Sequence, residues 1–169
     1  LLPEAVPKTA FICHLGLFEF VRMPFGLRNA PSSFQRMMDK MFSDLYKLGV
    51  RVYIDDILVF SRTMEEHLNV LEQIYQRLQE NNITLKRDKC EFFGTRVEYL
   101  GHLIGVDGVR PSPKIIEEVE QLETPTTKSK LKSVLAFLNY YRKFILNFSR
   151  IAKPLIELTK ETTRWLWDE

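Results

Sequence analysis

The chain has 169 residues, 45% of them hydrophobic and 27% charged, and this composition argues against an intrinsically disordered protein. No apolar run approaches the roughly 20 residues that a membrane-spanning helix needs, and no signal-peptide pattern opens the chain, so we expect no membrane partner. The net charge of +2 is nearly balanced. Cys13 and Cys90 fit neither a disulfide framework nor a zinc site, which favours a reduced intracellular compartment.

The first third of the chain contains a strand pattern followed by a helix pattern. Residues 9–13 and 17–21, separated by Gly16, predict a β-hairpin. After Pro31 the apolar side chains recur at helical spacing, which predicts a helix that ends before Gly49. The side chains of this stripe are Phe34, Met37, Met38, Met41, Phe42 and Leu45.

Two adjacent carboxylates, Asp55 and Asp56, interrupt an apolar stretch at residues 50–60. The β-branched and aromatic residues on both sides predict two short strands that meet at a tight turn. Like charges repel, and desolvating them at the edge of an apolar sheet is costly. A bound Mg²⁺ would offset this cost, because one or two carboxylates commonly hold that ion together with substrate phosphates. The alternative is a plain hairpin turn, although such turns more often contain Asn-Gly or Asp-Gly.

A second helix and a strand pair follow the carboxylates. Thr63 and Glu66 form a capping box, and the two residues at 81–82 end the helix that it opens. The face of this helix predicted to be buried carries Leu68, Leu71, Ile74, Tyr75 and Leu78. Residues 90–106 then predict a further pair of strands, with glycines that permit tight bends.

The pattern becomes wholly helical after residues 110–113. Ser112 is a predicted N-cap, and Pro113 suits the first helical position. Three helical segments follow, separated by Pro125 and by residues 147–149. The predicted fold class is therefore α+β, with an antiparallel sheet packed on helices over residues 1–109 and a small helical bundle over residues 110–160.

The helical part of the chain is strongly cationic. Residues 128–160 carry eight Lys or Arg side chains, against which Glu157 is the one acid. Such a surface attracts a polyanion, and nucleic acid is the obvious candidate, although a merely solvated surface is the alternative. The candidate phosphate contacts are Lys128, Lys130, Lys132, Arg142 and Lys143.

Four motifs, in this order, resemble those of reverse transcriptases. Residues 23–35 (MPFGLRNAPSSFQ) resemble the substrate-side loop and helix, and residues 53–56 (YIDD) resemble the Tyr-x-Asp-Asp signature. Residues 97–104 (VEYLGHLI) resemble the primer-grip hairpin. Residues 139–149 (NYYRKFILNFS) resemble a stretch typical of gypsy-type long-terminal-repeat retrotransposons. The motifs cover nearly the whole chain.

The resemblance implies an RNA-directed DNA polymerase that joins deoxynucleoside triphosphates to a primer on an RNA or DNA template. It implies two Mg²⁺ ions, for which Mn²⁺ is a substitute, held by Asp55 and Asp56. Lys89 matches the family's proton donor to pyrophosphate, but its charged neighbours favour a solvated turn as the stronger alternative. The residues implied to line the nucleotide and primer pocket are Tyr53, Ile54, Phe25, Gly26 and Arg28. Arg28 alone is equally compatible with a surface position.

The resemblance also implies a division into subdomains. Residues 1–109 correspond to a partial palm, residues 110–160 to the thumb, and residues 161–169 to the start of the connection toward an RNase H domain. The implied primer grip consists of Tyr99, Leu100, Gly101 and His102. The fingers and a third catalytic carboxylate would precede Leu1. We therefore expect a piece of a polyprotein with RNase H and integrase regions, inactive by itself and located in a cytoplasmic particle or the nucleus.

Two other functions compete with this interpretation. The first is a nucleic-acid-binding remnant of a retroelement without catalysis, which the expected lack of the third carboxylate favours. The second is another metal-dependent phosphoryl-transfer enzyme on a similar sheet, such as a nucleotide cyclase. This second alternative accounts neither for the cationic helices nor for the primer-grip resemblance.

Overall fold

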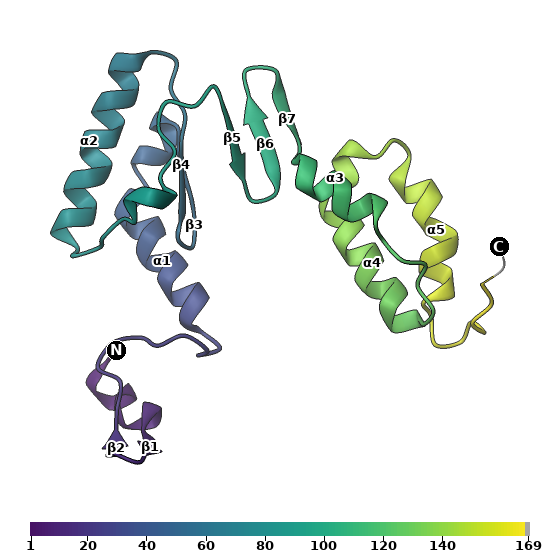
Figure 1. Cartoon of the computed structure of the whole chain (residues 1–169), viewed down its shortest axis with the longest axis horizontal. Coiled ribbons are helices and arrows are strands. Elements are labelled where there is room, and N and C mark those ends of the chain that lie inside the picture. The colour runs from purple at the N-terminus through teal and green to yellow at the C-terminus, as the bar shows by residue number, and fades with distance from the viewer. Residues whose placement is uncertain (168–169) are drawn as a thin grey trace. The chain divides into compact units, whose positions relative to one another are not determined.

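The computed structural model describes residues 1–167, and the chain divides into two compact units, Leu1–Cys90 and Glu91–Glu169 (Figure 1). The division falls before the three-stranded sheet described below. The palm and thumb boundary at residue 109 is a functional division and stays a prediction. Within the described residues, no helix has the length and apolar character needed to cross a lipid bilayer.

The first unit contains two β-hairpins and two long helices. Its elements are β1 (Phe11–Cys13), β2 (Gly16–Phe18), α1 (Ala30–Phe42), β3 (Val50–Tyr53), β4 (Asp56–Val59) and α2 (Met64–Glu80). Strand β1 pairs antiparallel with β2, and β3 pairs antiparallel with β4, as the sequence predicts. Both helices lie beside the β3–β4 hairpin (Figure 1). Short 3₁₀ turns occur at Pro3–Ala5, Pro7–Thr9, Leu45–Leu48 and Arg87–Lys89.

The core of the first unit lies between α1, α2 and the β3–β4 hairpin. Its buried side chains are Met38, Phe42, Leu45, Val50, Val70, Ile74 and Leu78. The predicted stripe of α1 is right for Met38 and Phe42, which lie one turn apart and are both buried, whereas Met37 is exposed. Residues four apart share a helix face, so these two side chains meet the sheet together.

The predicted buried face of α2 is partly wrong. Leu68 and Tyr75 are exposed, while Val70, which the prediction omitted, is buried with Ile74. A polar side chain also belongs to this buried face. Arg77 lies on the buried side, where it donates to the carbonyl oxygen of Met41 at 2.6 Å and pairs with both carboxylate oxygens of Asp44 at 2.5 and 2.6 Å. Counting apolar residues alone therefore misplaced the stripe.

Gly49 closes the base of the β3–β4 hairpin. Its φ of 90° is left-handed, and a Cβ there would collide with the carbonyl oxygen of Phe60. The main-chain N–H of Phe60 donates to the carbonyl oxygen of Gly49 at 3.0 Å. A residue without a side chain is required for this close approach.

The second unit is a three-stranded antiparallel sheet followed by three helices. Its elements are β5 (Arg96–Tyr99), β6 (His102–Gly105), β7 (Gly108–Pro111), α3 (Pro113–Glu120), α4 (Lys128–Tyr140) and α5 (Phe148–Leu158), with a 3₁₀ turn at Arg142–Phe144. The sequence predicted β5 and β6 but not β7, whose Gly, Arg and Pro residues are poor strand formers. Pairing with β6 in the register Ile104 to Val109 supplies the strand's hydrogen bonds instead.

The predicted start of the first helix of the second unit is confirmed. Ser112 is the N-cap of α3, and its side-chain oxygen accepts a hydrogen bond from the main-chain N–H of Ile115. Ser112 is fully buried, so this bond also satisfies a polar group removed from water. Helices α4 and α5 pack on each other, and Leu131 and Ala152 are buried there.

Candidate active site and nucleic-acid interface

The Asp55–Asp56 pair lies at the tip of the β3–β4 hairpin. Tyr53 pairs with Asp56, so Ile54 and Asp55 form the turn and Asp56 begins β4. Both carboxylates are exposed. Within residues 1–167, neither carboxylate accepts a hydrogen bond or forms an ion pair. Tyr53 is half exposed beside them. The turn therefore presents two carboxylates to solvent with their oxygens available to a ligand.

Ile54 gives this turn an unusual backbone. Its φ is 53°, and left-handed φ values are genuine outliers for β-branched residues. Positive φ at the first of two turn residues is typical of a type II′ turn, where glycine is preferred. Such a conformation costs about 1–3 kcal/mol and persists only where neighbouring groups hold it. Here the main-chain N–H of Ile54 donates to the side-chain Oε1 of Gln35 at 2.5 Å.

Gln35 belongs to a polar network that extends along α1. Its Nε2 donates to the carbonyl oxygen of Val52 at 3.2 Å and to Asp39 Oδ1 at 2.8 Å. The hydroxyl of Tyr46 donates to the same oxygen of Asp39 at 2.5 Å. The hydrogen bond from Tyr46, followed by that from Gln35, lowers the pKa of Asp39 below 3.8. An ionised Asp39 thus orients the amide that holds the turn.

Gln35 was not among the predicted site residues. The sequence carried a signal for it, because Gln35 precedes Met38 by three residues and Phe42 by seven and so lies on the apolar stripe of α1. A polar side chain on a buried stripe needs a partner. The partner is 19 residues away in the chain, at Ile54.

The other predicted pocket residues are not gathered at the carboxylates. Phe25, Gly26 and Arg28 lie in the segment that leads into α1, and Phe25 is fully exposed. Lys89 is exposed on the 3₁₀ turn after α2. Among residues 1–167, no hydrogen bond or ion pair joins Lys89 to the Asp55–Asp56 pair. Their catalytic and binding roles stay predictions.

A complete metal site is not formed by the described residues. Within residues 1–167, no three His, Cys, Asp or Glu side chains come together in a way that could hold a metal ion. Asp55 and Asp56 still fit a hard cation chemically, because both are carboxylates that have no partner among the residues that the structure describes. The pair supplies part of a ligand set, and further oxygens must come from elsewhere.

The predicted primer-grip residues form the β5–β6 turn of the second unit. Tyr99 pairs with His102, so Leu100 and Gly101 are the two turn residues, with φ values of 50° and 73°. Positive φ at both positions defines a type I′ turn. His102 is half-buried, and its Nδ1 lies 2.9 Å from the carbonyl oxygen of Leu100. The structure thus brings all the predicted primer-grip residues together.

The candidate phosphate contacts differ in their surroundings. Lys128 is half-buried at the start of α4, where its ammonium group donates to the carbonyl oxygens of Lys160, Glu161 and Thr163. An ammonium group has three donors, so these carbonyls occupy them. Lys128 therefore links the segment after α5 to α4. These hydrogen bonds compete with any contact between its ammonium group and a phosphate.

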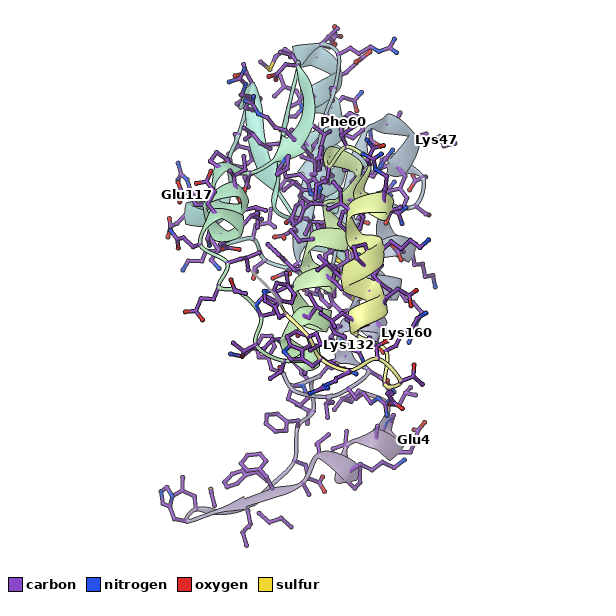
Figure 2. All side chains as sticks on the ribbon, turned by 90° about the vertical axis from the view of Figure 1, so that its right-hand side faces the viewer. Glu4, Lys47, Phe60, Glu117, Lys132 and Lys160 are labelled. Atoms are coloured by element: carbon purple, nitrogen blue, oxygen red, sulfur yellow. The ribbon has the colours of Figure 1, made fainter. Side chains whose placement is uncertain are left out.

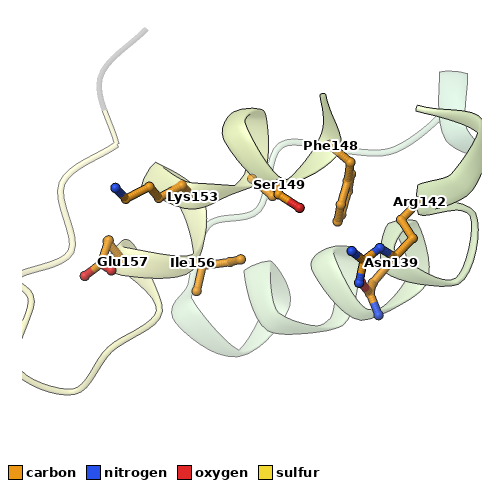
Figure 3. A pocket seen from close by; sticks show the side chains of 8 residues that line it. Asn139, Arg142, Phe148, Ser149, Lys153, Ile156 and Glu157 are labelled. Atoms are coloured by element: carbon orange, nitrogen blue, oxygen red, sulfur yellow. The ribbon is translucent and has the colours of Figure 1, made fainter. Parts of the chain in front are cut away.

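Lys130 and Lys132 lie on different flanks of α4, because residues two apart point roughly 160° apart around a helix. Lys132 shares its flank with Asn139, one of the residues that line a shallow pocket of about 240 Å³ between α4 and α5 (Figure 3). Arg142 and Lys153 line the same pocket. Glu157 also lines this pocket, so the face formed by the Lys132 flank and the pocket carries three cations and one acid.

The remaining charges of the second unit are mixed, because Arg96 and Arg110 both pair with Asp107. Lys143 is exposed, and its ammonium nitrogen lies 4.8 Å from the centre of the Phe144 ring. Lys132 and Lys160 lie toward the same end of the α4–α5 pair, whereas Glu117 on α3 points to solvent on another side (Figure 2). Lys160 pairs with Glu157 at 2.5 Å. Lys128 and Lys160 are thus engaged within the protein, whereas Lys130, Lys132 and Lys143 are exposed cations of α4 and of the turn after it.

Comparison with known proteins decides the family. The family profile described as "Reverse transcriptase (RNA-dependent DNA polymerase)" matches residues 3–104. The chain belongs to the reverse transcriptase family. The RNA-directed DNA polymerases of this family are nucleotidyltransferases, which agrees with the resemblance drawn from the sequence motifs.

Relatives of this reverse transcriptase chain are retrotransposon polyproteins. It is 40% identical over 161 residues to the "Retrovirus-related Pol polyprotein from transposon 297" of Drosophila melanogaster, covering 95% of this chain and 15% of that protein. It is 34% identical over 160 residues to the "Transposon Tf2-3 polyprotein" of Schizosaccharomyces pombe, covering 95% of this chain and 12% of that protein. The chain thus spans about 15% of the length of the curated relatives it matches.

Solved structures confirm the α+β fold class. A foamy viral protease-reverse transcriptase in complex with double-stranded DNA matches with a TM-score of 0.87 and 28% identity, covering 100% of this chain and 30% of that one. The same kind of viral protein in complex with an RNA/DNA hybrid matches with a TM-score of 0.77 and 29% identity, covering 95% of this chain and 22% of that one. Both nucleic acids are ligands of those viral proteins.

Proposed function

We propose that this reverse transcriptase chain supplies the catalytic carboxylates and the primer-binding surface of an RNA-directed DNA polymerase. The observation that carries the proposal is the exposed, unpartnered Asp55–Asp56 pair on a turn that Gln35 holds in place. In a chain of this family, such a pair suits transfer of a nucleotidyl group from a deoxynucleoside triphosphate to a primer 3′-hydroxyl. Catalysis of this kind rests mainly on positioning and on electrostatic stabilisation.

Asp55 and Asp56 would hold divalent cations, with Mg²⁺ as the expected ion and Mn²⁺ as a substitute. When bound, two such ions would activate the attacking hydroxyl and neutralise charge on the leaving pyrophosphate. Asp55 at the turn acts as the main ligand, and Asp56, the first residue of β4, as the second. The bond from Ile54 to Gln35 limits the movement of both carboxylates relative to α1.

The second unit would bind the template and primer. Lys132 and Arg142 lie on the face described above and would contact phosphates without reading sequence. The β5–β6 turn would contact the primer strand. The residue 139–149 motif supports assignment to a gypsy-type element. The polyprotein relatives support further regions in the complete protein, and RNase H and integrase are the regions that we propose.

Primer extension on an RNA template with Mg²⁺ tests this function. We would compare this chain with a form extended upstream by roughly a hundred residues, about the length of a domain. The extended form should synthesise DNA, and its Asp55→Asn variant should fall to background while keeping its affinity for the primer-template duplex. Synthesis by the Asp55→Asn variant would remove Asp55 from the catalytic role.

The second candidate is a nucleic-acid-binding remnant without catalysis. The observation that favours it is the lack of a third metal-ligating side chain near the pair within residues 1–167. This candidate predicts no synthesis by the extended form, together with duplex binding that weakens steeply as salt rises. The same experiment therefore separates the two functions.

A further inference from the structure

The Leu100–Gly101 turn is fixed to the second unit through both of its carbonyl groups. The carbonyl oxygen of Leu100 lies 2.9 Å from His102 Nδ1 and accepts a hydrogen bond from the Tyr140 hydroxyl at 3.3 Å. The carbonyl oxygen of Gly101 accepts from the main-chain N–H of the buried Ser112 at 2.9 Å. Because carbonyl oxygens only accept, His102 Nδ1 carries the hydrogen in the first contact.

The N–H groups of the same turn remain available. Within residues 1–167, the main-chain N–H groups of Leu100 and Gly101 donate no hydrogen bond. Successive N–H groups in a turn form a concave site that favours an anion. With its carbonyl oxygens held against the protein, the turn presents donors rather than acceptors to a phosphate.

Two tyrosines at the end of α4 contact this turn and the His102 ring beside it. The rings of Tyr140 and Tyr141 each lie 5.4 Å from the His102 ring, and their own centres are 4.9 Å apart in an edge-on arrangement. Tyr141 is buried, with 7% of its surface exposed. A Cβ at position 101 would overlap the Tyr141 hydroxyl oxygen. The hydroxyl therefore occupies the space directly beneath Gly101.

We propose that Tyr140 and Tyr141 are positioning residues that fix the Leu100–Gly101 turn against the end of α4. The N–H groups of the turn then bind a phosphate of the primer in a fixed position. The inference rests on the proposed polymerase function. It assigns these tyrosines an effect on catalysis through the primer end, without contact with the reacting atoms. The cations of α4 and α5 determine the affinity for the duplex, whereas the two tyrosines determine the position of the primer end.

The test uses the extended form of the protein and the variants Tyr140→Phe and Tyr141→Phe. Each removes one hydroxyl and keeps the ring. Tyr140→Phe loses the hydrogen bond to the carbonyl oxygen of Leu100, so kcat for primer extension should fall about fivefold. Tyr141→Phe removes the hydroxyl that packs beneath Gly101 and should also lower kcat. The KM for primer-template and the duplex Kd should stay unchanged. Tyr75→Phe is the matched control, because Tyr75 is an exposed tyrosine on α2.

A rescue experiment separates positioning from general stability. Gly101→Ala should slow extension, because its Cβ meets the Tyr141 hydroxyl and its φ of 73° disfavours a side chain. Adding Tyr141→Phe should restore part of the rate, and adding Tyr140→Phe should not. Equal rates for Tyr140→Phe, Tyr141→Phe and Tyr75→Phe would overturn the inference, as would parallel losses of Tm and duplex affinity. An inactive wild-type form would instead refute the proposed polymerase function.

Discussion

The two units each present a two-residue hairpin turn, and they hold these turns by different means. In the first unit, Ile54 begins a turn whose N–H group is bound by the amide of Gln35. In the second unit, Leu100 begins a turn whose carbonyl group is bound by a tyrosine hydroxyl and an imidazole. Both first residues have left-handed φ values without being glycine.

The two ways of holding the turns leave different groups available, side-chain carboxylates in the first turn and main-chain N–H groups in the second. The first turn leaves the Asp55 and Asp56 side chains free and is held by its backbone, which suits a site whose ligands are carboxylates. The second turn leaves backbone N–H groups free and is held by its carbonyl groups, which suits a phosphate. In both turns a helix behind the hairpin supplies the restraint, α1 in one case and α4 in the other.

The largest effect should come from removing the restraint on the first turn. Gln35→Ala leaves the Ile54 N–H without its partner, and an unmade hydrogen bond of this kind costs about 1–3 kcal/mol. We expect DNA synthesis by the extended form to fall at least about tenfold, with duplex affinity unchanged. Gln76→Ala, an exposed glutamine change on α2, is the control. Equal rates for the two variants would show that the carboxylates need no restraint from α1.

A smaller effect should distinguish the cations of the second unit. Lys132→Glu should weaken duplex binding. It should also reduce the slope of log Kd against log salt concentration by about the amount that one phosphate contact contributes. Fluorescence anisotropy measures both quantities. Lys130→Glu on the other flank should leave the slope nearly unchanged, and a slope change equal to that of Lys132→Glu would contradict the assigned face. Lys128→Ala should lower Tm instead, because its ammonium group binds three carbonyls.

The smallest effect should appear as opposite pH sensitivities of the two units. Pairing with Arg77 lowers the pKa of Asp44 from 3.8 to about 2, so this pair stabilises the first unit above 3.8 and is lost as pH falls toward about 2. Burial raises the pKa of Tyr141 above 10.0, so the contribution of this side chain to the stability of the second unit is lost as pH rises past that value.

The tryptophans make this pH comparison measurable. Trp165 and Trp167, the only tryptophans of the chain, both belong to the second unit. In an acid titration, the helical circular-dichroism signal should fall before tryptophan fluorescence changes, and Asp44→Asn should reduce the pH dependence of the early change. Coincident acid transitions in both signals would show that the units do not differ in this way.

The sequence by itself determined the features that depend on near neighbours. The N-cap at Thr63, the N-cap at Ser112 and the hairpin around Asp55 were predicted correctly, because each rests on propensities and spacings within a few residues. The second half of the predicted capping box differs, because the Glu66 carboxylate accepts from the main-chain N–H of Arg62. The family motifs are equally local. They indicated the reverse transcriptase family, and the matching family profile agrees. The roles of the carboxylate pair and of the β5–β6 turn stay predictions.

Only the tertiary structure decided which long-range partners complete these local features. The partner of Gln35 is 19 residues away, and those of Lys128 are 32 to 35 residues away. Arg77 lies on the buried side of α2, where it donates to the carbonyl oxygen of Met41. Residues 108–111 form strand β7 because they pair with β6, although their sequence does not favour a strand. Periodicity records which side chains are apolar. It does not show which distant polar group will form a hydrogen bond with a buried one. Such distant partners, Gln35 for the first turn and Tyr140 for the second, hold the two hairpin turns in place.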